Sequence, residues 1–175
     1  MNKFIFIFGG IKSGKSSYAV QLAKKLGKKV AFIATATASD EEMKKRIKLH
    51  KSSRPKTWKT IEENEDVTGM IEKTGNEYEV IIIDCLGLLV SNLFLKELKE
   101  PEIIKKIKKL KNVVSKSKRT VILVSNDVGS SLVPDNPLGR RFADLIGFAN
   151  QIMAKNAEEV VFMQAGVPVK IKSRS

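Results

Sequence analysis

A glycine-rich segment carries the strongest chemical signal in the chain. Residues 9–16 have the sequence Gly-Gly-Ile-Lys-Ser-Gly-Lys-Ser, which matches the phosphate-loop pattern G-x4-G-K-[ST]. Its glycines let successive backbone N–H groups turn toward phosphate oxygens, and the N-terminus of a following helix adds a positive dipole. Lys15 is expected to reach the β- and γ-phosphates, and the Ser16 hydroxyl to bind Mg²⁺. The motif therefore predicts nucleoside triphosphate binding.

A carboxylate at the end of another apolar run could complete a metal site. Asp84 ends the sequence Val-Ile-Ile-Ile-Asp, the form expected of a carboxylate that faces a phosphate loop and holds Mg²⁺ through water. Asp is also common at strand ends without such a role, but the phosphate loop favours the metal role. The next residue, Cys85, has no second Cys or His nearby, so we predict buried packing for it.

The single histidine, His50, allows two interpretations. It lies in a helix-like run over residues 40–51, where it could be an ordinary surface residue. Its neighbours Lys48, Lys51 and Arg54 would instead draw a phosphate toward a neutral imidazole, which could attack the α-phosphorus of a nucleotide. That attack would give a covalent nucleotidyl phosphoramidate.

Three more side chains could be either structural or functional. Arg140 and Arg141 could meet a phosphorylated substrate or a triphosphate, or could make structural contacts only. They follow residues 126–137, a segment with Pro and Gly of the kind that often forms functional loops at the carboxyl edge of a parallel sheet. Trp58 could stack on a base, but we expect core packing because a single Trp is usually an apolar anchor.

Apolar runs alternating with helical patterns indicate the fold that must position these residues. Strands are predicted over residues 4–8, 30–34, 80–84, 120–125, 160–164 and 167–171, and helices over residues 15–26, 40–51, 86–98, 102–116 and 138–155. This alternation predicts an α/β fold with a mostly parallel central sheet flanked by helices. The last two strands could form a C-terminal β-hairpin. We expect one domain over residues 1–175, because neither a linker nor a repeat divides them.

The charge of the chain suggests an anionic partner. There are 32 Lys and Arg residues against 19 Asp and Glu, a net charge of +13. Residues 1–60 hold 15 basic and 3 acidic side chains, and residues 103–119 hold 8 basic and none acidic. The first block surrounds the phosphate loop and favours a triphosphate. The second is predicted to be the solvated face of an amphipathic helix, with a membrane or nucleic-acid contact as the alternative.

Cysteine content and hydropathy suggest a compartment. Cys85 is the only cysteine, so a disulfide within the chain is impossible and a reducing environment fits. The apolar run over residues 4–8 is too short for a secretory signal or a membrane span. We therefore expect a cytoplasmic protein without stable membrane insertion.

The residues above occur in an order that resembles one enzyme family. The matching segments are the phosphate loop, Ile33-Ala-Thr-Ala36, Asp40-Glu-Glu-Met-x-x-Arg46-Ile-x-x-His50, Arg54-Pro-x-x-Trp58, Asp84-Cys85-Leu86, Ser91-Asn92-Leu93, Ser125-Asn126-x-Val-Gly129, Val133-Pro134 and Arg140-x-Phe-x-Asp144-x-x-Gly-x-x-Asn150-Gln151. In these the chain resembles the bifunctional adenosylcobinamide kinase/adenosylcobinamide-phosphate guanylyltransferases of cobalamin nucleotide-loop assembly. The resemblance covers nearly the whole chain, and its His50 and Asn126 segments are far more specific than the phosphate loop.

The resemblance implies a RecA-like P-loop fold and two successive reactions. A nucleoside triphosphate, GTP or ATP, phosphorylates the aminopropanol hydroxyl of adenosylcobinamide. GMP then passes from GTP to that phosphate through a covalent His50–GMP intermediate, which yields adenosylcobinamide-GDP and pyrophosphate. The family resemblance also implies a homotrimer with sites between subunits, and no nucleic-acid partner.

Site residues follow from the same resemblance. His50 and Lys15 are the expected catalytic residues, and Ser16 and Asp84 the expected Mg²⁺ ligands. The expected nucleotide-binding residues are Gly9, Gly10, Ile11, Lys12, Ser13, Gly14, Lys15, Ser16, Ala34, Thr35, Ala36, Lys51, Ser52, Ser53, Arg54, Glu62 and Asp84. A substrate loop would add Asn126, Asp127, Arg140 and Arg141.

The chain departs from the family pattern at a few positions. Lys12 replaces the usual Arg of the loop, which keeps the charge but loses bidentate geometry. Asp127 replaces the usual Glu, so it either contacts the corrinoid or only orders its loop. Two other functions remain open: a small-molecule P-loop kinase in which His50 is incidental, and a RecA-like ATPase that binds nucleic acid. The second lacks the interleaved aromatic and basic residues typical of such proteins, since there are 2 Tyr and 1 Trp.

Overall fold

Seven strands form one sheet in the computed structural model, which describes residues 2–38, 40–52, 54–74, 77–129 and 133–173. The strands are β1 (Phe4–Gly9), β2 (Val30–Ala34), β3 (Lys59–Glu62), β4 (Val80–Asp84), β5 (Thr120–Asn126), β6 (Glu159–Gln164) and β7 (Val167–Ser173). The helices are α1 (Lys15–Leu26), α2 (Glu41–Ser52), α3 (Val67–Lys73), α4 (Leu86–Leu95), α5 (Glu100–Ser115) and α6 (Pro137–Asn156). The sheet order is β3-β2-β4-β5-β1-β6-β7.

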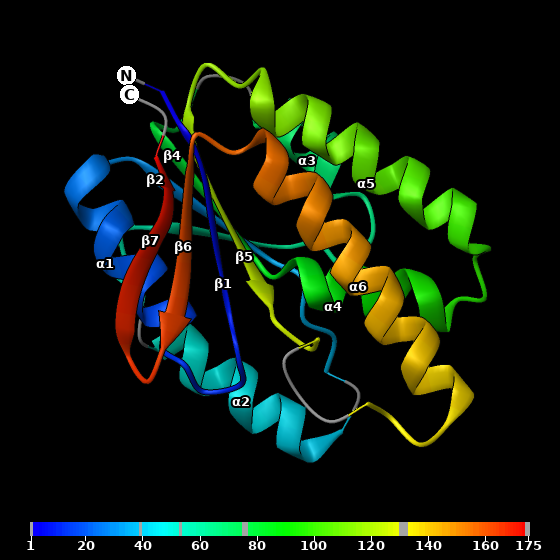
Figure 1. Cartoon of the computed structure of the whole chain (residues 1–175). Coiled ribbons are helices and arrows are strands. Elements are labelled where there is room, and N and C mark those ends of the chain that lie inside the picture. Colours follow the sequence, from blue (N-terminus) through cyan, green and yellow to red (C-terminus); the bar gives the residue numbers. More distant parts are fainter. Residues whose placement is uncertain (1, 39, 53, 75–76, 130–132, 174–175) are drawn as a thin grey trace.

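Parallel pairing places the carboxyl ends of strands β1 to β6 at one edge of the sheet. Strands β1 to β6 pair in parallel, and β7 returns antiparallel to β6 as the expected hairpin. Helices α3 to α6 cover one face and α1 the other, so the central strands are apolar throughout (Figure 1). Helix α2 lies beyond the carboxyl ends of the strands (Figure 1). The predicted α/β fold with a mostly parallel sheet is confirmed.

Two elements escaped prediction because their sequences lack a clear pattern. Strand β3 has the sequence KTIE and only exposed or half-buried residues, since it forms the edge of the sheet. Helix α3 has seven residues and begins at the N-cap Asp66, whose carboxylate accepts from the backbone N–H of Gly69 at 3.0 Å. The helix predicted over residues 86–98 ends earlier, at Leu95, before Glu97 adopts a positive φ of 60°.

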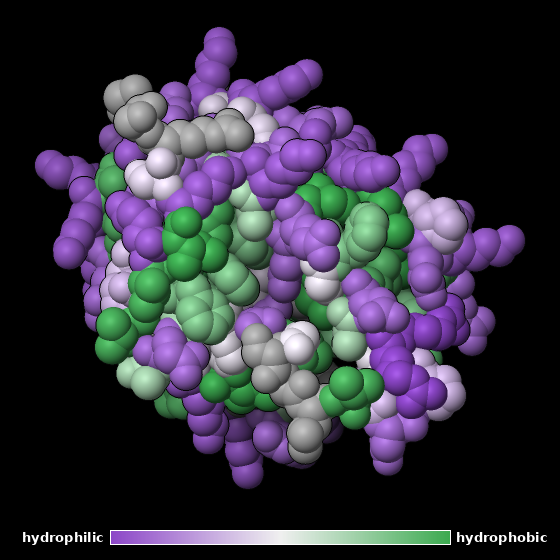
Figure 2. Space-filling view, in the orientation of Figure 1, coloured by the Kyte–Doolittle hydropathy of each residue, from purple (hydrophilic) through white to green (hydrophobic). Residues whose placement is uncertain are grey.

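Helix α5 has the amphipathic form predicted for the second basic block. It buries Ile103, Ile107, Leu110 and Val114 against the sheet. Its lysines project outward, and Figure 2 shows hydrophilic side chains over this part of the surface. In the described ranges, none of the helices combines the length and the apolar character that a membrane crossing requires.

Candidate nucleotide-binding and transfer site

The phosphate loop has a backbone that only glycine can adopt at two positions. Gly9 has φ 156°, and a Cβ there would lie 2.4 Å from the carbonyl oxygen of Met163. Gly14, the N-cap of α1, has the left-handed φ of 93°. The loop is also braced by its neighbours. The backbone N–H of Asp127 donates to the Gly9 carbonyl at 2.9 Å, and that of Gly166 to the Ser13 carbonyl at 3.1 Å.

Lys15 begins α1 and folds back over the loop. Its side chain is nearly buried, at 7% exposure, although it carries a charge. Its Nζ donates to the carbonyl oxygen of Gly10 at 2.5 Å and to Oγ of Ser13 at 3.4 Å. Because the ammonium belongs to the first residue of a helix and lies against the backbone of the phosphate loop, this part of the cavity favours a polyphosphate.

The end of β4 places an acid opposite the loop. Asp84 is half-buried, and its backbone carbonyl accepts from the N–H of Thr35 at 3.0 Å. The Asp84–Cys85 peptide bond is cis. Oγ1 of Thr35 donates to the Cys85 carbonyl and accepts from the Cys85 N–H, both at 2.7 Å. Burial, and secondarily the Asp84 charge, raises the pKa of the Cys85 thiol to about 12, so Cys85 is a packed, neutral side chain as predicted.

One cavity of about 930 Å³ joins these parts at the carboxyl edge of the sheet. Fourteen of the residues expected in the site line it: Ile11, Lys12, Ser13, Gly14, Lys15, Ser16, Ala34, Ala36, His50, Lys51, Arg54, Glu62, Asp84 and Asn126. The cavity thus brings both Mg²⁺ candidates, the phosphate loop and His50 to the same space.

Helix α2 brings His50 over this cavity. The Lys51 ammonium, beside His50, forms an ion pair with the Glu62 carboxylate of β3 at 3.1 Å. The Arg54 guanidinium lies 3.5 Å from the centroid of the Phe32 ring. Burial lowers the pKa of Arg54, while the negative charges of Asp84 and Glu62 oppose that shift. Cations and carboxylates therefore alternate around the imidazole end of the cavity.

Several expected residues lie elsewhere. Gly9 and Gly10 shape the loop without lining the cavity, Thr35 is buried beneath it, and Ser52 donates to the carbonyl of Leu49 at 2.8 Å. Ser53 lies outside the described residues, as do residues 130–132 of the predicted loop.

The two arginines of the predicted substrate loop make local contacts. Arg140 donates to the carbonyls of Pro134 and Asp135 at 3.0 and 2.8 Å. Arg141 pairs with Glu100 at 2.9 Å. Neither arginine lines the cavity, and Trp58 packs against the core cluster beneath α1, as predicted. The structure thus assigns both arginines structural contacts in this chain conformation.

Residue-type reasoning missed the inner face of α2. Glu42, Met43, Lys45, Ile47 and Leu49 line the cavity with His50. Met43, Ile47 and His50 recur at helical spacing, which is the signal that indicates a shared face. That face was not recognised because the sequence does not show that the helix lies over the carboxyl edge of the sheet (Figure 1).

The fold and the glycine-rich loop define a RecA-like P-loop nucleotide-binding protein. Solved structures similar to the chain include the RadB recombinase, with a TM-score of 0.53 at 13% identity over 91% of this chain and 73% of that one. Another is a protein called PH0250 from Pyrococcus horikoshii OT3, with a TM-score of 0.62 at 11% identity over 99% and 87%. These similarities show the fold alone.

Sequence comparison shows the family. The family model described as cobinamide kinase / cobinamide phosphate guanyltransferase matches residues 5–171, and the chain belongs to this family. The bifunctional adenosylcobalamin biosynthesis protein CobP of Pseudomonas aeruginosa is 36% identical over 167 residues, covering 95% of both chains. The corresponding CobU protein of Escherichia coli is 33% identical over 180 residues, covering 96% of this chain and 99% of its own. The expected family and enzyme class are confirmed.

Proposed function

We propose that this chain, as one domain, phosphorylates adenosylcobinamide and then attaches GMP to the new phosphate through His50. The observation that carries the proposal is the shared cavity, which is lined both by the phosphate loop and by the only histidine of the sequence. A kinase that used the loop alone would have no need of an imidazole in the same space. Membership of the family supports both activities.

The first reaction uses the loop end of the cavity. The aminopropanol hydroxyl attacks the γ-phosphorus of GTP or ATP, and the bond from that phosphorus to the bridging oxygen breaks to release the diphosphate. Lys15 and the loop N–H groups are placed to stabilise the charge that develops on the phosphoryl oxygens. The substrate-loop residues Asn126 and Asp127 would meet the corrinoid, and Asn126 lines the cavity.

The second reaction uses His50. One imidazole nitrogen attacks the α-phosphorus of GTP, a P–N bond forms, and the bond to the bridging oxygen breaks to release pyrophosphate. The other nitrogen gives its proton to solvent. The phosphate of adenosylcobinamide phosphate then attacks the same phosphorus, the free ring nitrogen takes a proton back from solvent, and cleavage of the P–N bond restores the neutral imidazole. Lys51 and Arg54 are close enough in sequence and in the cavity to hold the departing oxygens.

The donor set of the cavity fits Mg²⁺. Ser16 supplies a hydroxyl and Asp84 a carboxylate to the same cavity, both hard oxygen ligands, and Mg²⁺ usually takes its other ligands from phosphates and water. When bound, the ion would neutralise the triphosphate and help to align its phosphates. Ser16 and Asp84 are therefore proposed as its protein ligands.

Self-association is part of the same proposal. Ile11 and Leu49 line the cavity, although they are 78% and 71% exposed. Apolar side chains so exposed at a site would be covered by a neighbouring copy in the homotrimer expected from the family, in the cytoplasm. A trimer mass by light scattering supports this arrangement, and a monomer mass at micromolar concentration contradicts it.

The covalent step is tested by labelling. The chain is incubated with GTP labelled at the α-phosphate, and the denatured protein is assayed for a label that is acid-labile and base-stable. His50→Ala is expected to lose the label and guanylyl transfer while retaining kinase activity. Lys44→Ala is the control, because Lys44 is exposed on the same helix and does not line the cavity.

Three results would contradict the proposal. Wild-type protein that turns over without ever carrying label excludes the covalent intermediate. A His50→Ala protein with full guanylyltransferase activity excludes His50 as the nucleophile. A chain that phosphorylates adenosylcobinamide but does not transfer GMP from GTP to the product is a kinase only.

A further inference from the structure

Helix α2, which carries His50, has little packing to hold it in place. Of its side chains that the structure describes, none is buried: Met43, Ile47 and His50 are half-buried and the others exposed. A helix in a protein usually keeps its position by burying one face. Within one copy of the chain, the position of α2 therefore depends on the segments at its two ends and on the polar contacts they make.

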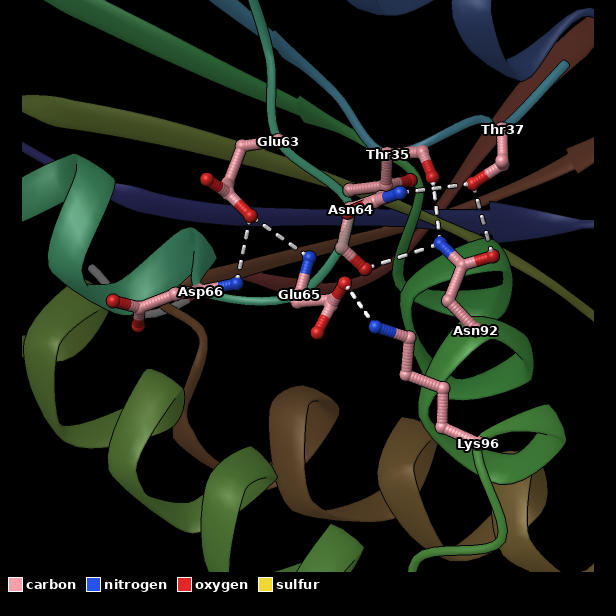
Figure 3. Close-up of polar contacts among 8 residues, drawn as sticks. All are labelled: Thr35, Thr37, Glu63, Asn64, Glu65, Asp66, Asn92 and Lys96. Atoms are coloured by element: carbon pink, nitrogen blue, oxygen red, sulfur yellow. Dashed lines mark hydrogen bonds and ion pairs between the residues drawn. The ribbon is translucent and has the colours of Figure 1, made fainter.

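The segment before α2 is held by one side chain of α4. Nδ2 of Asn92 donates to the Thr35 carbonyl at 2.8 Å and to the Asn64 carbonyl at 3.1 Å. The first carbonyl belongs to the connection from β2 to α2, and the second follows β3, the strand that comes after α2. Figure 3 shows the Asn92 amide between the two segments. A single amide thus joins the chain entering α2 to the strand end beyond it.

A second set of contacts closes the same junction. Oγ1 of Thr37 donates to Oδ1 of Asn92 at 3.4 Å, and Nδ2 of Asn64 donates to Oγ1 of Thr37 at 3.1 Å (Figure 3). Asn92, Thr37 and Asn64 therefore form a ring of hydrogen bonds. The Asn92 amide thus uses both of its N–H donors and its oxygen acceptor. Few side chains other than a carboxamide could make the same set of hydrogen bonds.

The junction lies directly behind the wall of the cavity. Ala34 and Ala36, on either side of Thr35, line the cavity, and so does Glu62, two residues before Asn64. Glu62 in turn pairs with Lys51, the neighbour of His50. Asn92 itself does not line the cavity, so any effect it has on the reaction must pass through these segments.

We propose that Asn92 is a positioning residue for guanylyl transfer, because it ties the segment that enters α2 to the end of β3, the strand that follows α2, and so sets where His50 lies. This inference rests on the proposed function of His50. The inference predicts that the two reactions respond differently to loss of the Asn92 amide. The kinase step uses the phosphate loop, which is braced by β5 and the β6–β7 turn rather than by Asn92. Loss of the Asn92 amide should therefore slow nucleotidylation of His50 much more than phosphoryl transfer.

Asn92→Asp is the sharpest variant, because it keeps the size of the side chain and replaces the NH2 donor by a carboxylate facing two carbonyl oxygens. In single-turnover labelling with α-labelled GTP, the rate of adduct formation is expected to fall about 10- to 100-fold, while the kinase rate changes by less than about threefold. The ratio of the labelling rate to the kinase rate is the readout, because a general loss of stability would lower both rates together.

Lys96→Ala is the matched control on the same helix. Lys96 lies one turn after Asn92 and forms an exposed ion pair with Glu65 at 2.5 Å, so it contacts the segment after β3 without bridging to the segment before α2 (Figure 3). Both rates are expected to stay within about twofold of wild type, since exposed ion pairs contribute little. Should Asn92→Asp fail to fold, Thr37→Val removes part of the same ring at an exposed position and is expected to show the same selectivity, more weakly.

The outcomes separate the inference from the proposed function. Parallel loss of both rates in Asn92→Asp, or no change in either, overturns the positioning role while leaving His50 labelling of the wild type intact. Absence of label in the wild type overturns the proposed function and this inference together.

Discussion

Two helices line the same cavity and are held in opposite ways. Helix α1 begins in the phosphate loop and buries Lys15, Ala19, Val20 and Ala23 against the sheet. Helix α2 carries His50 and has no buried side chain among those described. Helix α1 covers the centre of the sheet, whereas α2 connects β2 to the edge strand β3. Core packing thus holds the helix that follows the phosphate loop, whereas the helix that carries His50 has little packing within the chain.

This difference suits the two reactions proposed for the cavity. Phosphoryl transfer requires a rigid arrangement of donors around the triphosphate. Nucleotidylation requires an imidazole that can approach the α-phosphorus and later accept attack from the second substrate. A weakly packed helix can serve the second need without disturbing the first.

Removing the positive charge of Lys15, in the phosphate loop, is expected to have the largest effect on activity. Lys15→Ala should lower both the kinase and the guanylyltransferase rates by about 10²- to 10³-fold, because both need the triphosphate held in the loop. The contrast with His50→Ala, which should affect one activity only, is measured by assaying both reactions on both variants. A Lys15→Ala protein that lost only one activity would show that the two triphosphates do not share the loop.

The difference in packing between the core beneath α1 and helix α2 can be measured through the free energy of unfolding of single variants. Ile82→Ala removes a fully buried side chain from the core cluster beneath α1 and is expected to lower the free energy of unfolding by about 2–5 kcal/mol. Lys44→Ala, on α2, is expected to change it by less than about 0.5 kcal/mol, since the Lys44 side chain is 56% exposed. Urea unfolding checks both, and equal losses would mean that α2 contributes as much to stability as the core beneath α1.

A smaller effect is expected from pH, which should change the contribution of the buried Cys85 thiol to the free energy of unfolding. The pKa of Cys85 rises from 9.0 to about 12 on folding, so the folded chain keeps a proton that the unfolded chain loses. Its contribution to stability is complete below pH 9 and declines as the pH rises toward 12. The stability difference between wild type and Cys85→Ala should therefore narrow between pH 8 and pH 11. A constant difference would contradict the burial of a neutral thiol.

Local sequence patterns anticipated most of the fold and much of the cavity. The phosphate loop, the apolar strands and Asp84 are recognisable because their chemistry lies within a few consecutive residues. Strand β3 and helix α3 were missed, since an edge strand needs no apolar run and a seven-residue helix shows no period. Arg140 and Arg141 were weighed evenly from the sequence, and only their contacts with loop carbonyls and with Glu100 distinguish the two readings in this conformation.

The sequence by itself determined the family, the parallel α/β architecture and the residues able to bind a triphosphate, because each depends on local patterning and on motif order along the chain. Tertiary structure alone decided how His50 reaches the cavity and which contacts hold it there. Asn92 is 42 residues from His50 in the chain, and its amide connects two segments that become neighbours only when β2, β3 and α4 assemble. Hydrogen bonds between such distant segments leave no periodic trace in a single sequence, so their role appears only in the folded chain.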